Sequence, residues 1–313
     1  MYKHIVQSKE WAEVKESYGT PVIKVGEIYY TKHKIPRTNL CFAYCPRVDP
    51  KLVDIKKLKS SLRENDCVGL TFDVPNELAN SPQGKKARDT FEKHCLKSSR
   101  SEFAGANFLM DISKPEIEIF EGMHKKHRYN ARYAERNGVK IKLAKSEEDF
   151  EEFFKMFKDT ASRQGYFIRP KRYYQLIWQI LHSKDICHIL TAEYQGKPLA
   201  SWMVFLYEKV IYYPYGGSSE EHKNLYASNA LGWEVIRFGK EKGCEIFDMW
   251  GAAEDPKDKN DEYYGFTRFK EKFGAEHVKY VQSYDLVVKK IPYLVFRKAN
   301  NLRWKLLEMG LIK

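Results

Sequence analysis

No apolar run in this 313-residue sequence reaches the length of about 20 residues that a membrane-spanning helix requires. The first residues also lack an apolar stretch, so we expect no secretory signal peptide. Cysteine is sparse: the six cysteines include no Cys-x-x-Cys pair, which argues against the common zinc and redox motifs and is typical of reduced thiols. Together these absences predict a cytoplasmic protein.

Several motifs of nucleotide and hydrolytic chemistry are missing too. The chain contains no GxxxxGK[ST], GxGxxG, HExxH or GxSxG, which argues against an ATPase, a dinucleotide oxidoreductase and a metallohydrolase. His124 and His127 have a spacing that could ligate a metal, but they lie in a basic stretch that would repel a cation. We therefore expect neither a bound metal nor a cofactor.

The composition is that of a packed, basic protein. Hydrophobic residues make up 43% of the chain and aromatic residues 14%, which is enough apolar surface for two domains with separate cores. The net charge of +12 and the pI near 9.2 indicate an anionic partner: nucleic acid, nucleotide phosphates or an acidic membrane surface.

Hydrophobic periodicity predicts an α/β (α+β) chain in two parts, each with a mixed, largely antiparallel sheet flanked by helices. We place a first domain at 1–145, completed by the C-terminal segment 290–313, and a second domain at 146–289. The predicted strands are 22–30, 40–44, 68–72, 107–112, 139–143, 186–194, 200–207, 210–215, 244–250 and 278–288. The predicted helices are 52–65, 84–97, 121–137, 147–163, 171–182, 228–242 and 291–311.

One predicted helix combines basic and aromatic side chains. Arg128, Arg132 and Arg136 share one face at spacings of four residues, while Tyr129 and Tyr133 lie on the neighbouring face. Such a face suits phosphates and stacked bases, because arginine offers a planar fork of donors and tyrosine a π-face. The alternative is a solvated surface helix whose arginines pair with nearby acids.

The segment 291–311 also allows two interpretations. Its apolar residues favour one face and its basic residues the others. It is either a helix that packs back onto the first domain or a basic amphipathic helix that touches the inner face of an anionic membrane.

Cationic and aromatic side chains gather in further short motifs, each of which could be plain surface, core or a binding site. These are Lys34-Ile-Pro-Arg37, Arg169-Pro-Lys-Arg172-Tyr173, Tyr213-Pro-Tyr215-Gly-Gly and Phe266–Gly274, which contains Lys270. The number and order of these motifs resemble the FemABX family. The matching segments are Gln7–Trp11, Tyr44–Arg47, Arg128–Val139, Ile168–Tyr174, Tyr213–Glu220, Trp233–Gly251 and Phe266–Gly274.

The resemblance implies two tandem GNAT-like acyltransferase domains and a cytoplasmic aminoacyltransferase of peptidoglycan synthesis. Such enzymes take an amino acid from aminoacyl-tRNA and attach it to the side-chain amine of the stem peptide, which builds the interpeptide bridge. This chain shows no sustained heptad run, so it is similar to compact members that lack a coiled-coil arm. The acceptor is either UDP-MurNAc-pentapeptide or lipid II, and we expect a monomer.

The resemblance also assigns roles to individual residues. Asp73 matches an acidic residue near the acceptor amine, and Lys270 a lysine near the transferred aminoacyl end. The Arg128, Arg132 and Arg136 face is our hypothesis for tRNA phosphates. Where the family has an aromatic residue just before the first-domain aspartate, this chain has Val68. The residues expected at the uridine nucleotide and sugar-phosphate are Lys34 with Arg37, Arg169 (or Arg172), Tyr173, and Tyr215 (or Tyr213).

Two other functions fit parts of the sequence. An acyl-CoA-dependent GNAT N-acyltransferase would need a glycine-rich pyrophosphate loop, and the nearest approach, Gln83–Ala87, lacks the second glycine. A non-enzymatic RNA-binding protein would explain the charge and the Arg/Tyr helix but not the order of the other motifs. The residue types favour acyl transfer by positioning and electrostatics, since an aminoacyl ester needs no covalent nucleophile.

Overall fold

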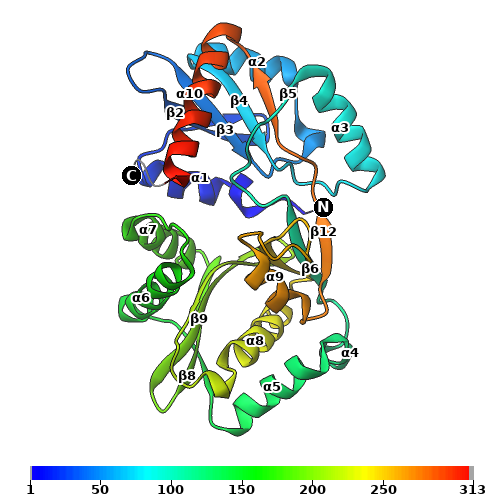
Figure 1. Cartoon of the computed structure of the whole chain (residues 1–313), viewed down its shortest axis with the longest axis vertical. Helices are drawn as coiled ribbons and strands as arrows, with labels where there is room; N and C mark the ends of the chain where they lie inside the picture. Colours follow the sequence, from blue (N-terminus) through cyan, green and yellow to red (C-terminus); the bar gives the residue numbers. More distant parts are fainter. Residues whose placement is uncertain (1, 310–313) are drawn as a thin grey trace. The chain divides into compact units, whose positions relative to one another are not determined.

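The chain folds into two units, each built on its own sheet. The structure is a computed structural model and describes residues 2–309. Unit 1 contains Lys3–Phe103 and the segment from Tyr280 onward, and unit 2 is Ala104–Lys279. The chain therefore leaves unit 1, builds unit 2, and returns to complete unit 1 (Figure 1).

Unit 1 is built on a six-stranded sheet with the order β1–β2–β3–β4–β13–β5. Neighbouring strands are antiparallel, except that β3 and β4 are parallel. The strands are β1 (Val22–Val25), β2 (Ile28–Lys34), β3 (Cys41–Pro46), β4 (Cys67–Asp73), β5 (Leu96–Lys97) and β13 (Tyr284–Val287). The helices are η1 (Ile5–Gln7), α1 (Lys9–Ser17), η2 (Pro50–Leu52), α2 (Ile55–Glu64), α3 (Pro82–His94) and α10 (Lys290–Glu308).

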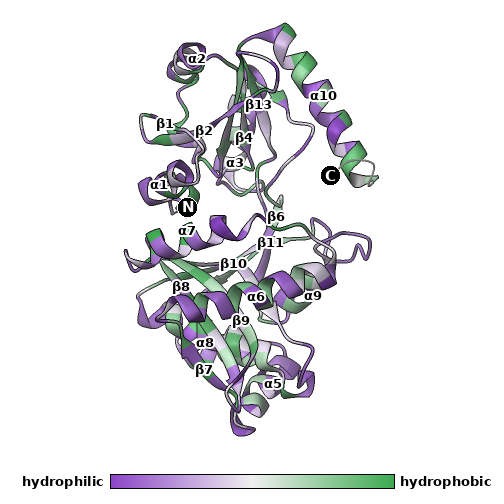
Figure 2. Ribbon diagram, turned by 90° about the vertical axis from the view of Figure 1, so that its left-hand side faces the viewer, coloured by the Kyte–Doolittle hydropathy of each residue, from purple (hydrophilic) through white to green (hydrophobic). Residues whose placement is uncertain are grey.

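The two faces of the unit 1 sheet differ in chemistry because side chains alternate along each strand. Leu70 and Phe72 of β4 and Leu286 of β13 belong to an apolar core that also contains α2 and α3 residues. The intervening residues Thr71 and Asp285 point to the opposite face, which α10 covers. Figure 2 shows α2 and α10 on opposite sides of this sheet. The α10 face is therefore the polar one.

Unit 2 is built on a seven-stranded sheet with the order β12–β6–β11–β10–β9–β8–β7. Only β10 and β11 pair in parallel; the other neighbours are antiparallel. The strands are β6 (Ala106–Asp111), β7 (Lys140–Leu143), β8 (Cys187–Tyr194), β9 (Lys197–Tyr207), β10 (Val210–Ser218), β11 (Ile246–Ala252) and β12 (Glu276–Lys279). The helices are α4 (Glu116–Gly122), α5 (Lys125–Arg136), α6 (Glu147–Gln164), α7 (Lys171–His182), η3 (Lys223–Leu225), α8 (Ala227–Glu241) and α9 (Tyr264–Glu271).

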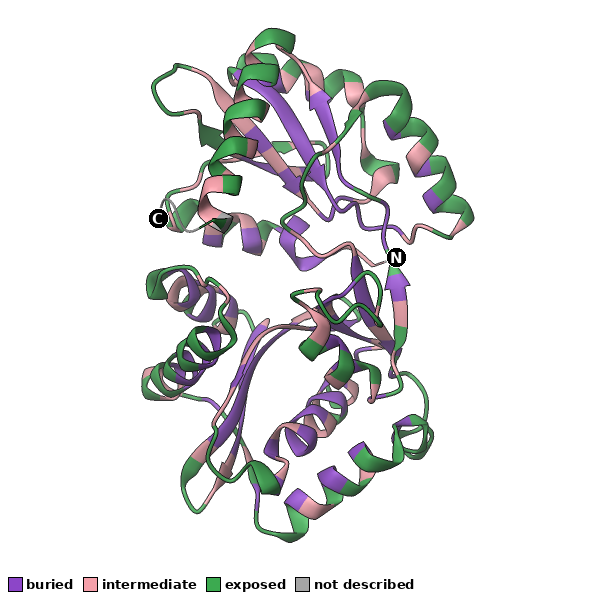
Figure 3. Ribbon diagram, viewed as in Figure 1, coloured by how far each residue is buried: buried purple, intermediate pink, exposed green. Residues whose placement is uncertain are grey.

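Helices cover both faces of the unit 2 sheet. α5 and α8 contribute Ala131, Leu231 and Ile236 to a core with one face of the strands. On the other face α6 packs against β9 and β10, and α7 packs against β8. The inner strands β6, β8, β9, β10 and β11 are largely buried, whereas the edge strands β7 and β12 are more exposed, and each helix exposes one side (Figure 3). In the part of the chain that the structure describes, no helix is both long enough and apolar enough to span a membrane.

The mixed α/β fold with helix-flanked, largely antiparallel sheets is confirmed, but the domain boundary differs from the predicted one. We placed it at 145/146, whereas the units divide at 103/104 and 279/280. The physical reason is strand pairing: β6 pairs with β11 and β12, and β7 with β8, so 104–145 belongs to unit 2.

Three predicted elements are also corrected. The predicted strand 278–288 is two strands, β12 in unit 2 and β13 in unit 1. The predicted strand 22–30 is the hairpin of β1 and β2, which turns at Gly26 with a positive φ of 60°. The predicted helix 121–137 is broken at Met123 and His124 into α4 and α5. The predicted helix 291–311 is α10, which packs on β4; its residues from 310 on lie outside the described part.

Candidate active site

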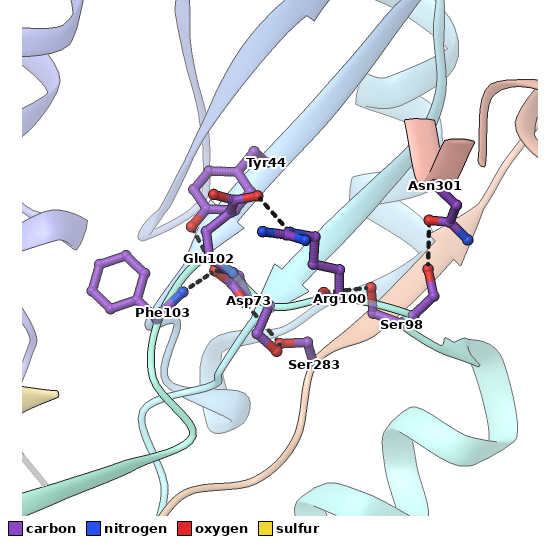
Figure 4. Close-up of polar contacts among 10 residues, drawn as sticks. Tyr44, Asp73, Ser98, Arg100, Glu102, Phe103, Ser283 and Asn301 are labelled. Carbon is purple, nitrogen blue, oxygen red and sulfur yellow. Dashed lines mark hydrogen bonds and ion pairs between the residues drawn. The ribbon is translucent and has the colours of Figure 1, made fainter. Parts of the chain in front are cut away.

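In unit 1, the carboxylate of Asp73 lies at the end of β4 and accepts four hydrogen bonds. The Tyr44 hydroxyl (2.6 Å) and the backbone N–H groups of Glu102 and Phe103 (both 3.0 Å) donate to Oδ2. The Ser283 hydroxyl donates to Oδ1 at 2.7 Å. Figure 4 shows these donors converging on the carboxylate from separate segments of the chain. Asp73 therefore links β3, the 98–103 segment and the residue just before β13 through hydrogen bonds to one carboxylate.

The environment of Asp73 pulls its ionisation in two directions. The side chain is fully buried, and burial raises the pKa of Asp73, while its hydrogen-bond donors favour the carboxylate form. Because the four donors already occupy both oxygens, an incoming amine would have to displace some of them. The role of Asp73 at the acceptor amine stays a prediction. In the structure, its carboxylate holds neighbouring segments of unit 1 together through hydrogen bonds.

Asp73 forms part of the wall of a pocket on the α10 face of the unit 1 sheet. This unit 1 pocket opens to solvent, and its empty space, open solvent included, is about 510 Å³. Its lining combines aromatic, hydroxyl, carboxylate and guanidinium groups. The lining includes Phe42, Tyr44, Thr71, Asp73, Ser98, Arg100, Glu102, Asp285, Tyr293, Phe296, Arg297 and Asn301.

In unit 2, Lys270 is a buried lysine held at the end of β11. It lies one turn after Thr267 on α9, and both side chains face β11. The Thr267 hydroxyl accepts a hydrogen bond from the Ala253 N–H (2.8 Å), and the Lys270 ammonium donates to the Gly251 carbonyl (2.6 Å). Lys270 is only 7% exposed, and this burial lowers its pKa to about 7, although the negative charge of Asp248 opposes the shift.

An irregularity in the pairing of β11 lies next to Lys270. The pairing of β11 with β6 slips between Asp248 and Gly251, and Trp250 adopts a left-handed φ of 64°. Such bulges redirect the groups that follow them. The parallel pairing of β10 with β11 also reaches only to Tyr212 opposite Asp248. Lys270 is thus placed beyond the last paired residues of the two parallel strands.

Tyr213 and Trp202 form an aromatic wall beside Lys270. Their rings stack with centroids 3.8 Å apart, and the Lys270 ammonium lies 6.0 Å from the centroid of the Tyr213 ring. Burial raises the pKa of Tyr213 well above its ordinary value, so its phenol stays protonated. We call Lys270, Tyr213, Trp202 and Gly251 the lysine site.

Tyr215 belongs to a different cluster, on the opposite face of the unit 2 sheet. Its ring packs edge-on against Tyr174 (centroids 5.0 Å apart), and Tyr173 adjoins Tyr174 on α7. The Arg169 guanidinium lies 5.0 Å from the centroid of the Tyr173 ring. The structure therefore brings together Arg169, Tyr173 and Tyr215, three of the predicted substrate-binding residues. We call Arg169, Tyr173, Tyr174 and Tyr215 the tyrosine cluster.

A bulge in β10 separates the two tyrosines that the sequence left as alternatives. The pairing of β10 with β9 slips between Tyr212 and Tyr215. Without that slip, Tyr213 and Tyr215 would share a face, because side chains alternate with a period of two. Instead Tyr213 belongs to the lysine site and Tyr215 to the tyrosine cluster. Each can contribute to binding, but not in the same place.

Lys34 and Arg37 lie at the loop between β2 and β3 of unit 1. Lys34 is the last residue of β2, and Arg37 follows with a positive φ of 63°. Both side chains are exposed. They are available to a ligand, and their role with the nucleotide stays a prediction.

The three arginines of α5 do not form one uniform, free face. The Arg128 guanidinium donates to the carbonyls of Glu121 (2.7 Å) and Met123 (2.5 Å). These two residues lie at the C-terminal end of α4. The Arg132 guanidinium lies 4.6 Å from the centroid of the Phe120 ring. Arg136 is exposed and donates only to the Arg132 carbonyl (3.3 Å) among its described contacts. Two of the three predicted phosphate ligands thus also have structural contacts within unit 2.

The sequence interpretation missed Trp202, Thr71 and Asp285. Trp202 lies in an apolar run that reads as core, and nothing in the run marks the tryptophan as a wall of the lysine site. Thr71 and Asp285 each alternate with apolar core residues, and that alternation was the available signal. For Asp285 this signal was hidden, because the sequence analysis predicted one continuous strand over 278–288.

Two family models match overlapping parts of the chain. The FemAB family model matches residues 49–192, and an acetyltransferase (GNAT) domain model matches residues 122–263. Together with the sheets and helices described above, these matches indicate an α/β chain of GNAT-like architecture.

Two similar curated proteins are named as an alanyltransferase and a glycyltransferase. The chain is 28% identical over 154 residues to a UDP-N-acetylmuramoylpentapeptide-lysine N(6)-alanyltransferase of Weissella viridescens, covering 49% of this chain and 45% of that protein. It is 20% identical to a lipid II:glycine glycyltransferase of Staphylococcus haemolyticus, covering 61% of each. The chain thus spans about half to three-fifths of the length of these curated relatives.

Solved structures agree on the fold. A crystal structure of FemX superimposes with a TM-score of 0.81 at 16% identity, covering 94% of both chains. The structure of L-PGS from Bacillus licheniformis gives a TM-score of 0.56 at 13% identity, covering 94% of this chain and 96% of that one. The chain thus resembles the FemAB family over the residues that the family model matches, and it shares the fold of FemX.

Proposed function

We propose that this protein is an aminoacyltransferase of cell-wall synthesis. It takes an amino acid from aminoacyl-tRNA and attaches it to the side-chain amine of the stem peptide in a peptidoglycan precursor. Similarity to the FemAB family supports the general reaction, since the curated relatives are named as alanyl- and glycyltransferases of such precursors. The observation that carries the proposal is the buried ammonium of Lys270 at the end of β11.

The chemistry requires an amine to attack an ester carbonyl. The C–N bond forms, the C–O bond to the tRNA ribose breaks, and the amine loses a proton. Lys270 has a pKa of about 7, so at neutral pH it can hold negative charge that develops on the carbonyl oxygen or give a proton to the leaving ribose oxygen. An aminoacyl ester is already activated, so no serine or cysteine nucleophile is needed.

The tyrosine cluster of unit 2 suits the nucleotide part of the precursor. Arg169 and Tyr173 offer a guanidinium and an aromatic face, the groups that suit phosphate and a nucleotide base. The exposed Arg136 and the outer edge of α5 would meet tRNA phosphates. We place this reaction in the cytoplasm.

The acceptor is UDP-MurNAc-pentapeptide or its lipid-linked form, lipid II. A lipid-linked acceptor would bring the protein to the membrane surface. α10 exposes Ile291 (76%) and Val295 (64%) beside basic residues, which fits a peripheral contact of this kind. The same helix also packs on β4, so membrane contact would use only its outer side.

Acyl-CoA fits the structure less well as a donor. A pyrophosphate is usually held by a glycine-rich turn at a helix N-terminus. The segment 219–226, between β10 and α8, contains no glycine. Radiolabelled acetyl-CoA, added as a second donor to the assay below, tests this alternative directly.

The experiment is a transfer assay with purified protein and a pool of radiolabelled aminoacyl-tRNAs. UDP-MurNAc-pentapeptide and lipid II are offered as parallel acceptors. We expect label in one of them, and a loss of at least about a hundredfold in rate for Lys270→Met, which keeps the side chain's bulk but removes its charge. Lys279→Met, at an exposed position of β12, should keep wild-type activity. A folded protein that labels neither acceptor would contradict the proposal.

A further inference from the structure

Asp285 is the second buried carboxylate of the unit 1 pocket, and its surroundings differ from those of Asp73. It lies on β13, where its neighbours Tyr284 and Leu286 point into the apolar core. The Thr71 hydroxyl donates to its Oδ1, and the Tyr293 hydroxyl donates to its Oδ2 at 2.7 Å. Asp285 is only 4% exposed.

No cation pairs with this carboxylate among the residues that the structure describes. Its two partners are hydroxyl groups, which donate one hydrogen bond each and carry no charge. A buried carboxylate is normally paired with a cation or saturated by several donors, as Asp73 is. Asp285 has neither arrangement, and its unused lone pairs adjoin the empty volume of the pocket.

The pocket lining carries one more carboxylate than guanidinium groups, so one further positive group would balance its charge. The lining holds three carboxylates, on Asp73, Asp285 and Glu102, and two guanidiniums, on Arg100 and Arg297. Arg100 is already engaged: it pairs with Glu102 (3.7 Å) and stacks on the Trp304 ring, 3.8 Å from its centroid. Arg297 lies close to the Tyr293 hydroxyl without reaching Asp285 within ion-pair distance.

The walls of the pocket suit a slender alkyl chain that carries the positive group. Phe42 and Phe296 pack against each other with ring centroids 4.7 Å apart, and Tyr44 and Tyr293 add two further aromatic faces. Aromatic walls bury methylene groups favourably, and their π-faces attract a cation. A buried carboxylate in the lining, together with such walls, suits a primary ammonium on a short aliphatic chain.

We propose that the unit 1 pocket binds a primary alkylammonium group, such as a lysine-type side chain, with Asp285 as its counter-ion. Naming this group as the acceptor amine rests on the proposed function. The binding itself does not, because it follows from the contents of the pocket. Asp285, with two uncharged donors, can accept hydrogen bonds from an ammonium directly, whereas the saturated Asp73 shapes the adjoining wall.

The test measures binding without any transfer reaction. The probe is Nα-acetyl-lysine amide, whose only charge at pH 7 is the side-chain ammonium. Its matched control is Nα-acetyl-norleucine amide, which has the same alkyl chain without the ammonium. Dissociation constants come from ligand-observed NMR with the full chain. We expect the lysine compound to bind and the norleucine compound to bind at least about tenfold more weakly.

Two variants locate the site. Asp285→Asn keeps the side chain's volume and its acceptor for Thr71, and it should weaken binding of the lysine compound at least about tenfold. Arg297→Gln removes a nearby positive charge and should leave that binding unchanged or tighten it. If Asp285→Asn fails to fold, Arg297→Gln still decides: weaker binding in that variant would overturn the proposal. Equal binding of the two compounds, or undiminished binding by a folded Asp285→Asn variant, would overturn it as well.

The outcome is separable from that of the transfer assay. Selective binding of the lysine compound through Asp285, together with no transfer to either acceptor, would leave the ammonium pocket standing and remove the aminoacyltransferase function. If the wild-type protein transfers an amino acid but its Asp285→Asn variant binds the lysine compound normally, the aminoacyltransferase function stands and the ammonium pocket is overturned.

Discussion

At the residue scale, Lys270 shows how burial adjusts a functional group. A lysine on the surface is almost fully protonated at neutral pH, since its ordinary pKa is about 10.4. The apolar wall of Tyr213 and Trp202 removes water from Lys270 and lowers its pKa to about 7. The cost is folding stability, because the unfolded chain binds this proton more tightly than the folded protein does.

That cost gives a testable dependence on pH. Between pH 7 and pH 10.5 the unfolded state holds the lysine proton and the folded state does not, so stability rises with pH across this window. Lys270→Met removes the effect. We expect it to stabilise the protein by about 2–4 kcal/mol at pH 7 and by much less near pH 10.5. Urea denaturation of both proteins at the two pH values checks this; an equal difference at both would contradict it.

Asp73 provides a second test at the residue scale. Asparagine can accept at one atom only, so Asp73→Asn would set an NH₂ group against N–H or O–H donors that now bind the carboxylate. We expect a loss of about 2–4 kcal/mol in the free energy of unfolding. Asp89→Asn, at an exposed position of α3, should change stability by less than about 0.5 kcal/mol. Equal effects of the two variants would show that the hydrogen bonds of Asp73 are not stabilising.

At the element scale, close packing fixes how α6 lies on β10. A Cβ atom added at Gly217 would come within 2.7 Å of the Met156 carbonyl oxygen and 2.8 Å of the Phe157 nitrogen. Both atoms are backbone atoms of a helix, so they cannot rotate away. Only glycine allows this approach, and the tyrosine cluster lies beside it because Tyr215 packs on Phe157.

Substitution of that glycine should therefore be costly. We expect Gly217→Ala to destabilise the protein by about 1–3 kcal/mol, because α6 has to move off the sheet. Gly265→Ala is the matched control, since a Cβ atom there would meet nothing within 4 Å and the residue lies in α9. The control should be neutral or stabilising by up to about 1 kcal/mol. Thermal or chemical denaturation distinguishes the two; equal effects would mean that α6 adjusts freely.

At the scale of the whole molecule, unit 1 is completed by a segment that follows unit 2 in the sequence. β13 lies between β4 and β5 in the sheet, so its loss would remove an interior strand. The two points where the chain leaves and re-enters unit 1 are close together. The Arg47 guanidinium lies 6.0 Å from the centroid of the Phe103 ring and 3.6 Å from that of Tyr280.

This topology predicts that unit 1 folds without unit 2. Residues 3–103 joined to residues 280–309 by a linker of about six Gly and Ser residues should give a cooperatively folded protein, since such a linker can span the short gap. Residues 3–103 alone should not fold, because β13 and its Ser283 and Asp285 contacts are missing. Circular dichroism and NMR dispersion check both; a folded 3–103 fragment would contradict the role given to β13.

Much of the fold was predictable where a helix carries its own signals. α6, α7 and α8 begin and end within about a residue of the predicted bounds. Ser146 and Asp149 form a capping box at the start of α6, and Gly243, with a left-handed φ of 76°, follows the end of α8. α9 was not predicted, because eight residues with mixed charges and aromatic groups give too short a periodic pattern.

The candidate site was predictable only in part. The motifs identified Lys270, Tyr213, Arg169 and Tyr173, because they combine charged and aromatic residues at unusual density. They could not separate Tyr213 from Tyr215. That separation depends on the slip in pairing between β10 and β9, which alternation along one strand does not reveal.

The sequence by itself indicated the resemblance to the FemABX family, the mixed α/β class, most of the helices, and Lys270 and Tyr213 of the lysine site, because these depend on local spacing and composition. The tertiary structure alone decided the unit boundaries, the saturation of Asp73 and the place of Asp285. Those depend on pairs far apart in the chain: Ser283 donates to Asp73 across 210 residues, and Thr71 to Asp285 across 214. Only the fold brings such partners within hydrogen-bond distance, and no local pattern encodes which of them meet.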